Sequence, residues 1–383
     1  MSAAGAVHAA AQTSVPAPLS ECDLAEPARL LFELVSIPSV SRRERAAVGF
    51  LVERLRALGL RADVDDAGNA VGHAGRADAD LHVMLLGHID TVPGGPTPRI
   101  ESGRLYGRGS VDAKGPLAVF AAVAARLVRR PESGLRVTVV GAVEEEVSSS
   151  KGARFLASGP APDVCVIGEP SGVAGVTLGY KGRLLLDLER RRSTSHSAGP
   201  EPTATEDIVA AWNRVQTWST AWNSDVEARG RAGLFDQLQT ELQSIVTAPG
   251  VESPDEDRCR ATIGFRLPPE LGPADVAAHL RPQLAGLSVE ARGAERAWLS
   301  ERRGRLVAAF SGAIREVTGG RPRMLKKTGT SDMNVVAPVW GCPIVAYGPG
   351  DSRLDHTPDE SVELSEVRLA ADVLESALRR IAK

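Results

Sequence analysis

The stretch LHVMLLGHID, residues 81–90, joins an apolar run to a histidine and an aspartate at its end. The run predicts a buried strand. His88 leaves that strand, and Asp90 follows two residues later, where its carboxylate can hold the imidazole ring from behind. Such a partner fixes the tautomer of a metal-binding histidine and raises its basicity. On its own, a His-x-Asp pattern is more often an accident of the surface or core than a ligand pair.

Acidic and histidine residues follow other apolar runs in the same way. The runs are residues 135–141, 164–168 and 343–348. The residues that follow them are Glu144, Glu145, Glu146, Glu169 and His356. Apolar strands separated by helical stretches predict a mostly parallel sheet, and sites in such sheets lie beyond the carboxyl ends of the strands. Together with Asp112 in the segment GRGSVD, residues 107–112, these residues predict a two-metal hydrolase site.

Length and composition set limits on the class of protein. A chain of 383 residues exceeds what one hydrophobic core usually organises, so two domains are expected. The net charge of −3 argues against a nucleic-acid-binding protein, and no apolar run is long enough to span a membrane. The four cysteines have no metal-like spacing, which predicts a cytoplasmic protein without a disulfide framework.

The composition of the sequence and its pattern of predicted strands and helices change along the chain. Residues 1–20 are rich in Ala, Ser and Pro and predict a disordered extension. Residues 21–177 and 293–383 alternate strands with helices and predict the two halves of an α/β catalytic domain with a mostly parallel sheet flanked by helices. Residues 178–292 predict two helices against several strands, which indicates an inserted α+β domain serving as a lid and a dimerisation surface.

The motifs together resemble the aminoacylase/desuccinylase/deacetylase family of co-catalytic zinc exopeptidases. The motifs, in chain order, are Gly87-His88-Ile89-Asp90-Thr91, Gly107-Arg108-Gly109-x-x-Asp112-x-Lys114-Gly115, Glu144-Glu145-Glu146, Gly168-Glu169-Pro170, His196, Gly329-Thr330-Ser331-Asp332 and His356. The resemblance covers nearly the whole chain beyond its N-terminal extension. It implies the α/β fold of a zinc exopeptidase with an inserted lid.

The resemblance also implies the ligands of two divalent metal ions. His88 and Glu169 would bind one ion, Glu146 and His356 the other, and Asp112 would bridge both. Zinc is the expected metal, with cobalt as an alternative, because histidine and carboxylate ligands accept several divalent ions. The ions would polarise the scissile carbonyl and lower the pKa of a bound water.

The glutamate triplet requires a choice of register. In the family, an acidic pair stands at a fixed distance before a Gly-Ala or Gly-Thr, here Gly152-Ala153. This register implies that Glu145 is the general base, Glu146 a ligand and Glu144 a support. The alternative is a solvated acidic turn after a strand.

The resemblance implies roles for four further residues, each of which lies in a shorter motif. His196 would stabilise the tetrahedral oxyanion, often across a dimer interface. Arg266 resembles the lid arginine that grips a substrate carboxylate, although an asparagine-containing turn that commonly precedes this strand is absent. Thr330 and Ser331 either donate hydroxyls to the same carboxylate or cap the following helix.

Within the family, residues 143–153, 179–183 and 264–269 look most like the branch that releases lysine or ornithine from an amino-group carrier protein. In that branch the hydrolase cuts the isopeptide bond to the γ-carboxyl group of the carrier's C-terminal glutamate. Such carriers are acidic, so Lys181, Arg183 and Arg190 to Arg192 could form a docking surface. An ordinary solvated strand end explains the same residues nearly as well.

Two other functions remain open from the sequence. The first is a deacylase of free substrates such as acetylornithine, acetyl-lysine or succinyl-diaminopimelate. The second, a metal-binding or carrier-sequestering protein without turnover, is disfavoured because all five ligand positions and Glu145 are present.

Overall fold

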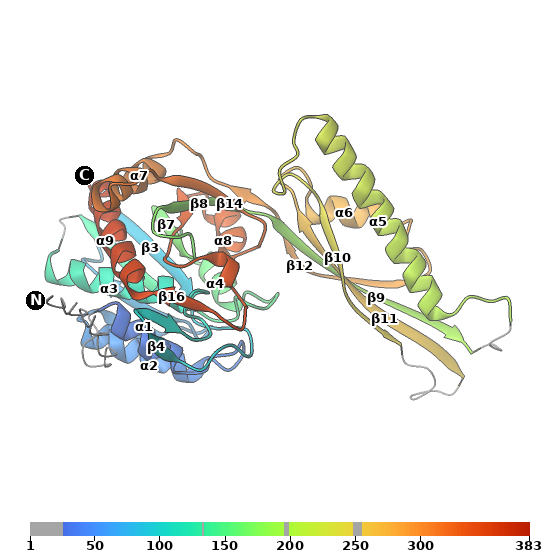
Figure 1. Ribbon diagram of the computed structural model, residues 1–383, viewed down its shortest axis with the longest axis horizontal. Helices are drawn as coiled ribbons and strands as arrows, with labels where there is room; N and C mark the ends of the chain where they lie inside the picture. Colours follow the sequence, from blue (N-terminus) through green and yellow to red (C-terminus); the bar gives the residue numbers. More distant parts are fainter. Residues whose placement is uncertain (1–25, 132–133, 195–198, 248–254) are drawn as a thin grey trace, which may run out of the picture.

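The computed structural model describes residues 26–131, 134–194, 199–247 and 255–383. Two lobes lie side by side, each with its own sheet and its own hydrophobic core (Figure 1). The first lobe comes from both ends of the chain, and the second lobe is inserted between them. The extension predicted at residues 1–20 lies outside the described residues.

The first lobe is built on a nine-stranded sheet in the order β1-β2-β6-β3-β7-β15-β8-β13, with β14 beside β8. The strands are β1 (Arg61–Val64), β2 (Ala70–Ala74), β3 (Leu81–His88), β6 (Leu135–Ala142), β7 (Val164–Gly168), β8 (Gly175–Tyr180), β13 (Trp298–Leu299), β14 (Arg323–Lys327) and β15 (Ile344–Ala346). The four central strands β6, β3, β7 and β15 run parallel, whereas β1, β2, β8 and β13 form antiparallel pairs toward the edges. The predicted fold class is therefore confirmed, with a parallel core inside a mixed sheet.

Helices cover both faces of this sheet. The helices of the first lobe are α1 (Ala28–Val35), α2 (Arg45–Ala57), α3 (Lys114–Arg129), α4 (Lys151–Ala157), α7 (Arg305–Thr318), α8 (Asp332–Trp340) and α9 (Leu364–Ile381). Helices α1, α2, α3, α7 and α9 share one core with the sheet, and α4 and α8 share the core on the opposite face. Because side chains alternate along a strand, β3 sends Val83 and Leu85 to the first core and Met84 and Leu86 to the second.

Two further elements lie beside the site described below. A three-stranded sheet joins β4 (Arg99–Glu101), β5 (Arg104–Tyr106) and β16 (Ser361–Glu363). A short 3-10 helix, η2 (Ser352–Leu354), precedes β16. The pairing of β5 with β16 brings the segments around residues 107 and 360 together although they are far apart in the sequence.

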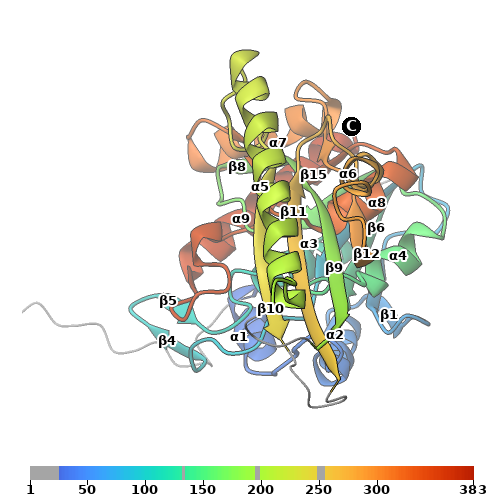
Figure 2. The ribbon, with the colours of Figure 1, turned by 90° about the vertical axis from the view of Figure 1, so that its right-hand side faces the viewer.

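The second lobe contains a four-stranded antiparallel sheet in the order β10-β11-β9-β12. Its elements are β9 (Gly182–Ser193), α5 (Ala204–Ala228), β10 (Gln239–Thr247), β11 (Glu256–Leu267), α6 (Pro273–Leu280) and β12 (Ser288–Glu295). Helix α5 lies along one face of the sheet (Figure 2) and buries Ile208, Ala211 and Val215 there. Thr203 caps the start of the helix: its hydroxyl accepts a hydrogen bond from the Glu206 backbone, and the Glu206 carboxylate accepts one from the Thr203 backbone.

The second sheet begins at Gly182 and ends at Glu295, whereas β8 and β13 on either side belong to the large sheet. The predicted domain limits of 178 and 292 lie within four residues of these positions, and the division into domains remains a prediction. Among the described helices, none combines the length and the apolar character that crossing a lipid bilayer requires.

Candidate metal centre and active-site cavity

The centre begins where β3 ends. His88 is the last residue of that strand and is 2% exposed; β6 pairs with β3 as far as His88, and β7 pairs with it as far as Gly87. Its Nδ1 lies 3.0 Å from the Asp90 backbone oxygen and 3.5 Å from the Asp90 carboxylate. If Nδ1 donates its proton in a hydrogen bond to this carbonyl, Nε2 keeps a free lone pair. This is the tautomer that a metal ligand needs.

The Asp90 carboxylate is fully buried and organises the loop after β6. It accepts hydrogen bonds from the backbone of Glu145 at 3.1 Å and of Glu146 at 3.0 Å, and from the Ser41 hydroxyl at 2.7 Å. Burial alone would raise the pKa of Asp90, but the hydrogen bonds hold it below its usual value. Asp90 therefore positions both the imidazole and the two glutamates beside it.

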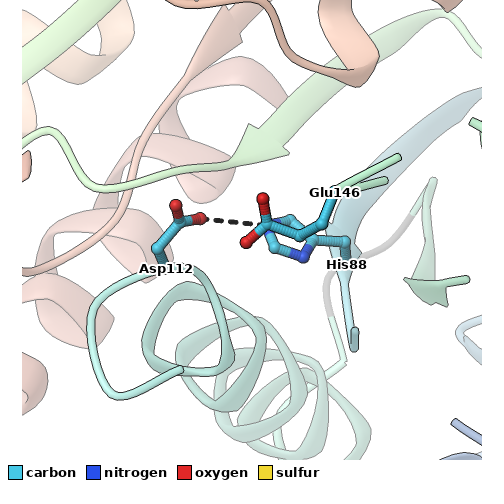
Figure 3. Close-up of side chains that lie close together, drawn as sticks. All are labelled: His88, Asp112 and Glu146. Carbon is cyan, nitrogen blue, oxygen red and sulfur yellow. Dashed lines mark hydrogen bonds and ion pairs between the residues drawn. The ribbon is translucent and has the colours of Figure 1, made fainter. Parts of the chain in front are cut away.

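Asp112 lies between two histidines just before α3 begins. One carboxylate oxygen is 3.1 Å from His88 Nε2, and the other is 3.1 Å from His356 Nε2. His356 Nε2 is also 3.1 Å from Glu146, and His88 Nε2 is 3.9 Å from Glu169. Figure 3 shows His88, Asp112 and Glu146 converging, and their ligand atoms all lie within 4.8 Å of one another.

A buried glutamate holds the backbone of Asp112 in place. One oxygen of Glu360 accepts hydrogen bonds from the backbone of Val111 at 2.9 Å and of Asp112 at 3.1 Å. The other oxygen pairs with Arg108 at 2.6 Å, so the charge of this fully buried carboxylate is compensated. Glu360 is four residues after His356, and one loop therefore supplies both a candidate ligand and the support of another.

Electrostatics favour cations at this centre. Burial raises the pKa of Glu145 well above its ordinary value, and the neighbouring carboxylates raise it further. Burial and the Asp112 carboxylate do the same to Glu169. The hydrogen bonds to Asp112 and Glu146 raise the pKa of His356 to about 10. Two histidines and several close carboxylates form the donor set of a site for two divalent ions, because bound cations relieve this repulsion.

A cavity of about 480 Å³ opens beside the carboxylates. Asp112, Glu145, Glu146, Glu169 and His356 line one wall. Four basic side chains also line it, together with polar residues and Asp355: Arg183, Arg266, Lys326 and Lys327. Among the described residues, none of these four forms an ion pair with a carboxylate. Their polar contacts are to other groups, such as Lys327 Nζ to the Pro170 carbonyl and Arg266 to the Thr330 hydroxyl at 3.0 Å.

The structure separates the three predicted substrate-binding residues. Arg266 and Thr330 line the cavity, and the Thr330 hydroxyl donates to the Lys181 carbonyl at 3.1 Å. Ser331 is 3% exposed, and its hydroxyl accepts a hydrogen bond from the Met333 backbone as the N-cap of α8. Of the two roles considered for Ser331, the structure shows the cap. The predicted role of His196 lies outside the described residues.

The structure contradicts the place of Lys181 in the predicted docking surface. Lys181 is fully buried, and its ammonium binds the backbone oxygens of Leu234 and Gln237. Arg190 and Arg192 both pair with Asp207 at 2.7 Å. These cations stabilise the second lobe, because their charges are already paired or bound to its own backbone.

Sequence reasoning missed several residues of the site. They are Glu360, Lys326, Lys327 and Asp355, of which the last three line the cavity. The lysines precede the motif Gly329-Thr330-Ser331-Asp332 by a single residue, and this nearness was an available signal. Glu360 gave no separate signal because its partners, Val111 and Asp112, are about 250 residues away in the sequence.

Comparison with known proteins agrees with this geometry. The family model "Peptidase family M20/M25/M40" matches residues 84–380, and the chain belongs to this family. It is therefore a hydrolase of a family whose members use divalent metal ions, usually zinc. A [LysW]-lysine hydrolase of Deinococcus radiodurans is 45% identical over 92% of this chain and 96% of its own length. A putative [LysW]-lysine/[LysW]-ornithine hydrolase of Thermococcus kodakarensis is 40% identical over 93% and 92%, respectively.

Solved structures show the same fold at low sequence identity. An M20 family metallo-carboxypeptidase from Sulfolobus solfataricus has a TM-score of 0.78 and 20% identity over 94% of this chain and all of its own. A tripeptidase from Staphylococcus aureus has a TM-score of 0.74 and 18% identity over 96% of this chain and all of its own. Both lobes are therefore part of a fold found in other members of the family.

Proposed function

We propose that this protein hydrolyses the isopeptide bond between the C-terminal glutamate of an acidic amino-group carrier protein and the α-amino group of lysine, ornithine or a related diamino acid. The observation that carries the proposal is the cavity, whose lining combines the candidate ligand set for two metals with four basic side chains that form no ion pair among the described residues. The names of relatives up to 45% identical to this chain support a carrier-bound substrate.

The chemistry of the substrate matches the charges of the cavity. The terminal glutamate of a carrier is linked through its γ-carboxyl group, so its α-carboxylate remains free. The released amino acid has a second free carboxylate beside the same bond. Two negative groups therefore flank the scissile amide, and unpaired Arg and Lys side chains suit them. An acetylated amino acid would bring one carboxylate to the same four cations.

The proposed roles of the metal-binding residues follow the contacts of Asp112. His88 and Glu169 lie on the side of one Asp112 oxygen, and His356 and Glu146 lie toward the other. We assign each pair to one ion and Asp112 to both. The resident metal is expected to be zinc, with cobalt as an alternative. When bound, the ions polarise the scissile carbonyl and make the attacking water more acidic.

The protein's own groups supply the proton transfers. Glu145 takes a proton from the attacking water, and its place in the cavity lining beside the candidate ligands Glu146 and Glu169 supports this role. Glu145 then gives the proton to the departing α-amino nitrogen. Asp90 positions His88 and the backbone of Glu145 throughout.

The remaining roles concern substrate and assembly. Arg266 and Thr330 are proposed to bind a substrate carboxylate, with Ser331 acting through the helix that it caps. His196 is proposed to stabilise the oxyanion, from its own or a partner subunit of a homodimer. The second lobe is proposed to serve as the lid and dimerisation domain of a cytoplasmic enzyme.

One competition assay tests the substrate. The metal-loaded protein is offered an acidic carrier charged with lysine or ornithine, beside acetyl-lysine, acetylornithine and succinyl-diaminopimelate. We expect the charged carrier to have the highest kcat/KM. Equal or faster cleavage of a free acyl amino acid would favour the deacylase function instead. Metal binding without turnover on any of these substrates would favour the sequestering function.

A further inference from the structure

We infer that Asn334 is a positioning residue that fixes the second lobe, and with it Arg266, relative to the metal centre. This inference rests on the proposed function for its kinetic consequence, but its structural part can be tested without any substrate. Asn334 is the third residue of α8 and is 1% exposed. Among the described residues, its hydrogen bonds are to Ser331, Tyr180, Lys181 and Arg296, none of which is a candidate metal ligand.

The two chain segments that connect the lobes meet beside Asn334. One segment passes through Lys181 into β9, and the other leaves β12 through Arg296. Backbone packs on backbone there, because a Cβ added to Gly182 would lie 2.4 Å from the Glu295 carbonyl and 2.8 Å from the Ala297 nitrogen. Gly182 therefore has no space for a side chain where the two connections cross, and the contacts that hold them come from neighbouring residues, among them Arg154, which pairs with Glu295.

The Asn334 amide binds both connections at once. Its Nδ2 donates to the Lys181 carbonyl at 3.1 Å and to the Arg296 carbonyl at 2.8 Å. Its Oδ1 accepts a hydrogen bond from the Ser331 backbone at 3.0 Å. One buried side chain thus joins the entry to the second lobe, the exit from it and the first turn of α8. A planar amide suits this position because it has two donors on one atom and an acceptor on the other.

The same network continues to the cavity. The Lys181 carbonyl also accepts a hydrogen bond from Thr330, and the Thr330 hydroxyl accepts one from Arg266. Arg266 lies on β11 in the second lobe, whereas the metal ligands lie in the first lobe. The distance between this guanidinium and the metal centre therefore depends on the crossing that Asn334 holds. If the crossing loosens, Arg266 is less often in place for a substrate carboxylate.

Asn334→Asp tests this role with a side chain of nearly the same size. The replacement sets a carboxylate oxygen against two carbonyl oxygens and removes both donors. Asn223→Asp is the matched control. The Asn223 amide likewise donates to a backbone carbonyl, of Leu238 at 2.9 Å, and accepts from the Leu238 backbone at 2.7 Å, but both groups lie in the second lobe. The control loses one hydrogen bond, to the Leu238 carbonyl, at a partly buried amide and does not touch the connections.

The first readout is the distance between the lobes. Spin labels are attached to cysteines introduced at two exposed positions, Arg321 in the first lobe and Ala221 in the second. We expect one narrow distance distribution in the parent protein and in Asn223→Asp, and a broadened or shifted one in Asn334→Asp. Asn334→Ala, which removes the donors without adding charge, should broaden it as well if the aspartate variant does not fold. A narrow, unshifted distribution in folded Asn334 variants would overturn the inference, and so would equal broadening in Asn223→Asp.

The second readout is kinetic. With the charged carrier as substrate, we expect Asn334→Asp to raise KM about tenfold, equivalent to about 1.4 kcal/mol, with full metal content and a smaller change in kcat. A fall in kcat with unchanged KM would overturn the link to Arg266. If the parent protein does not cleave the carrier, the proposed function fails, while the distance measurement still decides the role of Asn334.

Discussion

The two lobes bury their strands to very different extents. In the first lobe, the last six residues of β3 are buried, and His88 emerges at the end of that run. In the second lobe, none of the nine residues of β10 is buried, although that strand borders the strand of Arg266. The metal centre thus rests on a closely packed scaffold, whereas part of the cavity wall comes from a thin, half-exposed sheet.

This difference separates two physical requirements. Metal ligands must be held within a few tenths of an ångström, which a buried parallel sheet can provide. Substrate recognition tolerates more freedom, and thin lobes carry fewer buried contacts to resist movement. Both lobes supply basic residues to the cavity. Arg183 and Arg266 come from the second lobe, and Lys326 and Lys327 come from the first.

Removal of the metals is expected to have the largest effect and to act through the first lobe alone. Chelation should abolish hydrolysis, and added zinc or cobalt should restore it. Asp112→Asn should lower the metal content below two ions per chain, because one carboxylate contacts both histidines. Elemental analysis measures the content. Two tightly held ions in that variant would contradict the bridging role.

Glu145→Gln should have the next largest effect. We expect turnover to fall by about three orders of magnitude or more while both metals stay bound, because proton transfer is lost but the ligand set remains. Glu144→Gln is the control, since Glu144 pairs with Arg42 and Ser149 instead of the centre. Loss of metal in Glu145→Gln, with metal retained in Glu146→Gln, would show that the register is off by one.

Replacing the lysines of the cavity should have an intermediate effect. In Lys326→Gln with Lys327→Gln, KM for the charged carrier should rise about tenfold, because two unpaired cations are lost from the cavity wall. The difference in KM between this variant and the parent should shrink as the salt concentration rises, since charges more than about 10 Å apart are screened at 0.1 M salt. Lys151→Gln, an exposed lysine outside the cavity wall, should behave like the parent. An equal rise in KM for acetyl-lysine would argue against carrier recognition by these residues.

The smallest effect concerns the stability of the first lobe at low pH. His82 hydrogen-bonds to Thr138 at 2.8 Å, and burial together with Arg136 lowers the pKa of His82 to about 4. The unfolded chain takes up this proton near pH 6.5, whereas the folded chain does so near pH 4. Above about pH 6.5, His82 therefore does not change the free energy of unfolding with pH. As the pH falls from 6.5 to 4, it lowers the free energy of unfolding progressively.

The size of this effect is about 1 kcal/mol, after allowance for the half-exposed ring. Urea unfolding at pH 7 and pH 5 measures it. His82→Gln should lose less free energy of unfolding between these two values than the parent does. An unchanged pH dependence in His82→Gln would contradict the assignment.

The sequence predicted the parts of the site that depend on local order along the chain. Apolar runs followed by His88, Glu146 and Glu169 place these residues at one sheet edge, and the structure has them there. The antiparallel edges of the sheet were not predicted, because short apolar runs do not encode strand direction. The docking surface at Lys181 failed because burial of a lysine depends on carbonyls some 50 residues away, in the loop after α5.

The place of β15 in the large sheet has a consequence for biosynthesis. Strands β7 and β8 are neighbours in the sequence, yet β15 pairs with both and separates them. On the ribosome, β7 and β8 emerge about 175 residues before the strand that fills the gap between them. At about 5–20 residues per second, an unpaired strand edge persists for roughly ten seconds or more in the nascent chain. The second lobe is synthesised entirely within that interval, so it can fold first, while the metal centre must wait for His356 and Glu360 at the end of the chain.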